Sequence, residues 1–160
     1  MLQPVQTIYM LASVIAILTM HFFWLASIAT PEATFEMNSL GLQCVPADFA
    51  PGMMGWDLFL LLLVMLALPL ATIFLYKKRK LQLHLLIYTA VLDVCYYGLF
   101  FYDLSKYEDV VFALSTSKVM DTNCNAVMLF MPALSVFCLI MAMRGVIYDI
   151  ALLKSLDRLR

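Results

Sequence analysis

Charged side chains and glycine are both scarce in this chain of 160 residues. Asp, Glu, Lys and Arg together make up 13% of the sequence, and only five residues are glycine. An average soluble domain is about 25% charged. The sequence contains no glycine-rich phosphate loop, no nucleophile paired with a base, and no cluster of residues at metal-ligand spacing. These absences disfavour an enzyme, and they lead us to expect neither a metal nor another cofactor.

Apolar residues, in contrast, make up 64% of the sequence. Four apolar segments have about the 20 residues that a membrane-spanning helix requires. They are Thr7–Thr30, Leu58–Tyr76, Leu81–Tyr102 and Ala126–Met143. Residues 1–160 are therefore predicted to form one domain, an all-α integral membrane protein with an antiparallel bundle of four transmembrane helices. The predicted connections are outer loops at 31–57 and 103–125, a turn at 77–80 and a tail at 144–160.

The charges outside these segments separate by sign. The turn and the tail carry a net charge of +6, the two longer loops carry −6, and only Asp93 lies deep inside an apolar segment. Lys and Arg near spans are retained on the cytoplasmic side, so both termini are predicted to be cytoplasmic. Neither Lys nor Arg precedes the first apolar segment, which predicts a retained helix there in place of a cleaved signal peptide.

Two segments outside the spans also carry structural signals. Residues 33–38 and 40–45 alternate partly between apolar and polar around Ser39-Leu40-Gly41, which predicts a small β-hairpin in the first outer loop. In the tail, Ile147, Ile150 and Leu153 recur at helical spacing among charged residues. The tail is therefore predicted to be an amphipathic cytoplasmic extension of the fourth helix.

Three short stretches resemble one family. They are residues 1–10 (MLQPVQTIYM), 75–82 (LYKKRKLQ) and 155–160 (SLDRLR). Together they resemble an uncharacterised family of four-span proteins from the inner membrane of one phylum of Gram-negative bacteria. The resemblance implies a multi-pass protein of the bacterial inner membrane, but no activity and no catalytic residue.

Asp93 is the sharpest candidate for chemistry, because a carboxylate near the middle of a bilayer usually faces the bundle interior and has a partner. At the helical rise, Asp93 lies about 18 Å from the start of its segment and His21 about 21 Å from the start of the first. The two are predicted to share a depth and to form an intramembrane polar site. Tyr88, Tyr96, Tyr97 and Ser135 are further candidate partners. The site could hold a proton or a cation, or it could be an interhelical hydrogen bond.

The four cysteines are divided between loops and helices. Cys44 and Cys124 lie in different outer loops, on the oxidising side of the membrane, so a disulfide between them is a reasonable prediction. Cys95 and Cys138 lie in helices and are expected to act as small apolar packing residues. Four-span quinone-linked disulfide oxidases need an exchanging pair of loop cysteines, commonly Cys-x-x-Cys, which this chain lacks.

The basic run Lys77, Lys78, Arg79 and Lys80 is a candidate contact for anionic lipid headgroups. A bis-histidine haem site is disfavoured, because His84 lies near the start of its segment and differs from His21 by about 16 Å in depth.

The leading functional prediction is a non-enzymatic accessory or assembly subunit of a larger membrane complex. The alternative is a small homo-oligomeric transporter or proton-coupled channel that uses Asp93. A weaker alternative is a claudin-like scaffolding tetraspan, because Trp24 and the run Gly41-Leu42-Gln43-Cys44 partly match the loop pattern of claudins. The expected partners are the lipid bilayer and other membrane subunits or further copies of the chain, and no nucleic acid.

Overall fold

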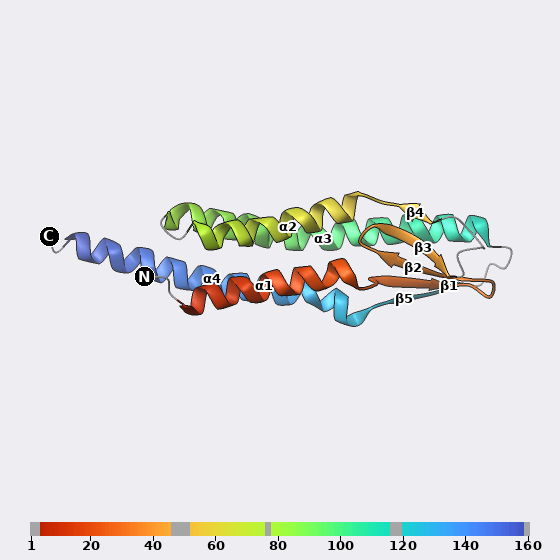
Figure 1. Cartoon of the computed structure of the whole chain (residues 1–160), viewed down its shortest axis with the longest axis horizontal. Coiled ribbons are helices and arrows are strands. Elements are labelled where there is room, and N and C mark those ends of the chain that lie inside the picture. Colours follow the sequence, from red (N-terminus) through yellow and green to blue (C-terminus); the bar gives the residue numbers. More distant parts are fainter. Residues whose placement is uncertain (1–3, 46–51, 76–77, 116–119, 159–160) are drawn as a thin grey trace.

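Four long helices form the body of the protein. A computed structural model describes residues 4–45, 52–75, 78–115 and 120–158. The helices are α1 (Pro4–Phe22), α2 (Asp57–Phe74), α3 (Arg79–Leu114) and α4 (Ala126–Arg158), and they run lengthwise beside one another (Figure 1). All four are long and apolar enough to cross a membrane. We call the end of the bundle where α2 meets α3 the turn end. The opposite end, which carries the β-strands described next, is the sheet end.

A five-stranded antiparallel sheet covers one end of the bundle. Its strands are β1 (Ala26–Ala29), β2 (Thr34–Asn38), β3 (Gly41–Val45), β4 (Met53–Met54) and β5 (Asp121–Cys124), in the order β4-β3-β2-β1-β5. The predicted hairpin is confirmed as β2 and β3. The all-α prediction needs correction, because this hairpin is the centre of a larger sheet.

The sheet packs one face on α3, and the other face is largely polar. Ile28, Phe35 and Cys44 lie side by side across three strands and are buried. They join a core with residues of α3, including Phe100 and Tyr107. The alternation of side chains along a strand turns the intervening row of Ser27, Glu36 and Gln43 to the opposite face.

The first helix is shorter than the predicted segment of residues 7–30. It ends at Phe22, and β1 follows at Ala26–Ala29. β1 pairs with β2 on one side and with β5 on the other. Such a short apolar run next to a helix shows no periodicity that separates strand from helix, so its pairing partners decide its conformation.

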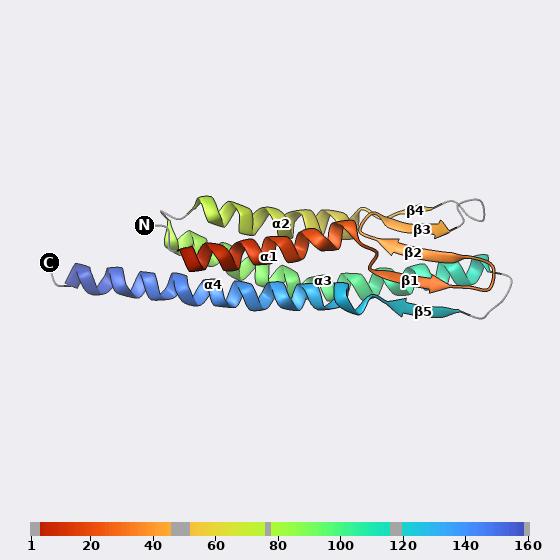
Figure 2. The same ribbon diagram turned by 60° about the horizontal axis from the view of Figure 1, so that its bottom comes forward.

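The third helix is longer than predicted, and its last part lies beside the sheet (Figure 2). It contains 36 residues and so rises about 54 Å, whereas a bilayer core is about 30 Å thick. Leu104, Tyr107 and Val111 recur at helical spacing and pack against the sheet. The sequence predicts an outer loop for residues 103–114 because they are rich in charge, but in the structure these charges lie on an amphipathic helix. We call residues 103–114 the α3 extension.

Candidate functional site

Asp93 lies in a buried polar cluster at the centre of the bundle. The Ser135 hydroxyl of α4 donates a hydrogen bond to Oδ2 of Asp93 at 2.8 Å, and the hydroxyls of Ser135 and Ser13 of α1 lie 2.7 Å apart. The side chains come from three helices, and all three residues are fully buried. Oδ1 of Asp93 accepts no hydrogen bond from any described residue. The cluster therefore joins α1, α3 and α4 and keeps one carboxylate oxygen free to take a proton or another donor.

His21 does not take part in this cluster. Ser13 marks the level of Asp93 along α1, and His21 lies eight residues further on, or about 12 Å at the helical rise. The His21 ring lies edge-on to Phe59 of α2 with centroids 5.3 Å apart. The depths estimated from the sequence hold only if the first and third segments begin at the same level along the bundle axis. In the structure α1 and α3 are shifted along this axis, so that Ser13, not His21, lies at the level of Asp93. Of the predicted partners of Asp93, the structure brings Ser135 to it.

A second polar cluster lies at the turn end of the bundle. The Asp149 carboxylate of α4 pairs with the Arg79 guanidinium of α3 at 3.2 Å and accepts a hydrogen bond from the Gln6 amide of α1 at 3.1 Å. Asp149 is only 5% exposed. Gly145 of α4 lies against Gln6, where an added Cβ would be 2.6 Å from the Gln6 side chain. This cluster ties three helices together at the end where their charged residues gather.

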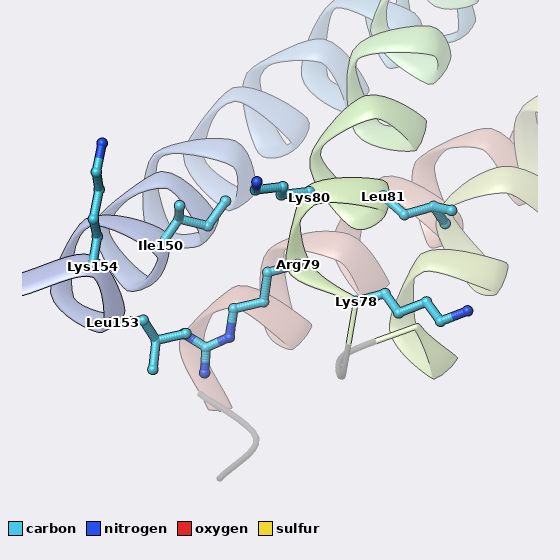
Figure 3. Close-up of a pocket in the computed structure, with 7 residues that line it drawn as sticks. All are labelled: Lys78, Arg79, Lys80, Leu81, Ile150, Leu153 and Lys154. Carbon is cyan, nitrogen blue, oxygen red and sulfur yellow. The ribbon is translucent and has the colours of Figure 1, made fainter. Parts of the chain in front are cut away.

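A cavity of about 730 Å³ lies beside this cluster, between the start of α3 and the last turns of α4 (Figure 3). Its lining combines four basic residues with three apolar ones. These residues are Lys78, Arg79, Lys80, Leu81, Ile150, Leu153 and Lys154. Three of the four residues predicted to contact lipid headgroups therefore line one cavity, and Lys77 lies outside the described residues. Sequence reasoning missed Lys154, because only the packing of α4 against α3 brings the tail to the turn.

Asp103 is a buried acid that sequence reasoning placed in a loop. It lies on the α3 extension and is fully buried where α3 passes the start of α2. The charges that act on it are those of Asp57 in α2 and Lys106. Asp93 is thus not the only buried acidic residue, since Asp103 and Asp149 are buried as well.

The two loop cysteines lie on different strands of the sheet. Cys44 is in β3 and Cys124 in β5, with β2 and β1 between them. Neighbouring strands are about 4.8 Å apart, so three steps separate the two residues by about 14 Å. A disulfide requires Cα atoms within about 7 Å. The predicted bridge between Cys44 and Cys124 is therefore wrong, and both are free thiols.

A protein-family model described as Domain of unknown function (DUF4293) matches residues 2–159. The chain belongs to this family. The match spans both polar clusters and the basic cavity, and it confirms the resemblance to an uncharacterised family. No curated protein and no solved structure matches the chain. Within the described part of this DUF4293 chain, no group of three or more His, Cys, Asp or Glu side chains is placed to hold a metal ion.

Mild oxidation of the DUF4293 protein should leave Cys44 and Cys124 unlinked. Burial, with a smaller contribution from the charge of Glu108, raises the pKa of the Cys124 thiol, so its reactive thiolate is scarce and native alkylation should be slow. Alkylation under denaturing conditions without reductant should modify both thiols, as peptide mass spectrometry would show. Cys44→Ser should leave the labelling of Cys124 unchanged. Recovery of a disulfide-linked peptide pair containing Cys44 and Cys124 would contradict the strand order.

Proposed function

We propose that this protein is a non-enzymatic four-span protein of the bacterial inner membrane, with both termini cytoplasmic, that acts as an accessory or assembly subunit of a larger membrane complex. The observation that carries the proposal is a sheet that packs on α3 outside the predicted spans and has exposed apolar side chains at its β3–β4 side.

The exterior of the helices supports the membrane part of the proposal. Large apolar side chains such as Phe74, Ile8 and Phe137 are more than half exposed, as suits contact with lipid. The described basic residues 78–80, Arg144 and Lys154 belong to the turn end, and the sheet end holds most of the acidic ones. Retention of Lys and Arg in the cytoplasm then puts the turn end inside and the sheet outside.

The cap supports the subunit part. At the β3–β4 side of the sheet, Val45 is 54% exposed and Met54 is 77% exposed, and Met53 is exposed as well. Met54 pairs with Gly41 and therefore lies on the face of the sheet turned away from α3, as Val45 does, whereas Met53 pairs with Leu42 and lies on the other face. Gly55, which follows Met54, lies beside Tyr107 in the part of α3 beyond the predicted span. Exposed apolar side chains outside the predicted spans are typical of contacts with other proteins. The core beneath the sheet holds it against α3, so a partner would meet a preformed surface.

Isolation of the tagged protein from its own membranes in native lipid tests this proposal. A partner should copurify in fixed stoichiometry, and Met53→Ser/Met54→Ser should release it. Asn123→Ser, which changes an exposed polar side chain on β5 at the opposite edge of the sheet, is the matched control and should retain the partner. A homogeneous monomer without a partner in native lipid would count against the subunit role.

A proton-coupled transporter or channel is the second candidate, and the free Oδ1 of Asp93 favours it. A buried carboxylate with one unpaired oxygen can take up and release a proton. Asp93→Asn should abolish proton flux into liposomes that carry an internal pH dye. Ser135→Ala, which keeps the carboxylate and removes its donor, should retain flux. Proton flux that is unchanged in Asp93→Asn would eliminate this candidate.

A further inference from the structure

We propose that the basic cavity between α3 and α4 binds the phosphate of an anionic lipid headgroup, with Lys80 and Lys154 as its principal cationic contacts. This proposal concerns the turn end of the molecule and does not depend on which protein partner binds the sheet end.

The charges in the cavity are arranged to attract an anion. Arg79 is held in place by its ion pair with Asp149, which uses one edge of the guanidinium. Lys80 and Lys154 form no ion pair with the side chains that the structure describes, which in α4 end at Ser155. Figure 3 shows Lys80 reaching toward α4, while Lys78 points away from it. Two ammonium groups from two helices thus border one cavity, and none of its described lining residues is acidic, as suits a phosphate.

The apolar part of the lining selects a lipid over a free phosphate. Leu81, Ile150 and Leu153 share the cavity with the cations. Leu81 also begins the predicted transmembrane part of α3, so the cavity lies where headgroups meet acyl chains. One lipid molecule could therefore place its phosphate near Lys80 and Lys154 and its acyl chains against Leu81 and Leu153. Basic pockets between membrane helices on the cytoplasmic side bind lipid headgroups in this way.

Native mass spectrometry of the full-length protein in mild detergent can measure the binding of added phosphatidylglycerol. Each Lys near an anionic lipid surface contributes about a factor of five in affinity, so Lys80→Gln/Lys154→Gln should weaken phosphatidylglycerol binding by about 30-fold. The matched control Lys106→Gln/Arg144→Gln removes the same charge from exposed positions outside the cavity lining. The control should bind within about twofold of the unmodified protein. Lys80→Arg/Lys154→Arg keeps the charge and should also bind.

Several results would overturn the proposal. Equal weakening in the cavity pair and the control pair would mean that overall charge, not the cavity, attracts the lipid. Phosphatidylcholine, which carries no net charge, binding as tightly as phosphatidylglycerol would remove the role of the anion. If inorganic phosphate binds the cavity as strongly as phosphatidylglycerol and displaces it, the ligand is a soluble phosphate. Weak binding by the arginine pair, with unchanged thermal unfolding, would show that the two positions do not act through charge.

Discussion

Gly41→Ala is expected to lower the free energy of unfolding by about 3 kcal/mol or more, from backbone strain and from a steric clash. Gly41 starts β3 with a φ of +128°, a conformation that residues with a side chain rarely adopt. A Cβ at this position would overlap the carbonyl oxygen of Met53 and lie 2.7 Å from the backbone nitrogen of Gly55. These neighbours are backbone atoms and cannot rotate away, so β4 would have to move from β3.

Trp24 and Trp56 provide a readout for this change, because they lie just before β1 and just before α2. Denaturant unfolding in micelles, followed by tryptophan fluorescence, should show the loss of stability. Gly98→Ala is the control, since a Cβ on Gly98 in α3 meets nothing within 4 Å. Alanine in a helix interior is favoured over glycine by about 0.5–1 kcal/mol, so this variant should be slightly more stable. Equal behaviour of the two variants would mean that Gly41 is not constrained as described.

Arg79→Gln is expected to cost about 3 kcal/mol, because it removes the ion pair that the Arg79 guanidinium forms with the buried Asp149 carboxylate. The side chain of Asp149 is 7% exposed, so solvent can replace little of the lost interaction. The side chain of Arg79 is 29% exposed, which places the effect at the low end of the range for buried pairs. Thermal unfolding in micelles should show the change.

A double-mutant cycle separates the ion pair from other effects. Asp149→Asn removes the buried charge, so Arg79→Gln/Asp149→Asn should be less destabilised than the sum of the two single variants. Arg144→Gln removes an exposed cation from the same helix as Asp149 and should change stability by about 0.5 kcal/mol or less. Additive costs of the two single changes would contradict direct coupling between Arg79 and Asp149.

Local pattern was sufficient for several elements of the fold. The four long helices follow from apolar segments of sufficient length, and the β2–β3 hairpin follows from the alternation around Gly41. The extension of the last helix to Arg158 follows from apolar residues at helical spacing in the tail. In each case the signal lies within a few turns or strand residues, because burial of one face repeats with the period of the element.

Other elements depended on segments far apart in the sequence. β1 is a strand because β5, about 95 residues later, supplies one of its two neighbours. The charged residues after Asp103 are helical because the sheet covers the apolar side of that segment. Cys44 and Cys124 share a sheet but are kept apart by the two strands between them. Composition carries no information on strand order or on which segments the sheet covers. For this reason the sequence predicts a loop for residues 103–114 and a disulfide between Cys44 and Cys124, and both predictions are wrong.

By itself, the sequence determined four helices long and apolar enough to cross a membrane, the separation of basic from acidic residues, and membership in a family of unknown function. Only the tertiary structure decided that Asp93 meets Ser135 and not His21, that Asp103 is buried, and that Lys80 and Lys154 share a cavity. Periodicity along the chain reports which face of an element is covered. The stagger between packed helices, which decides which side chains meet, is set by contacts between distant segments.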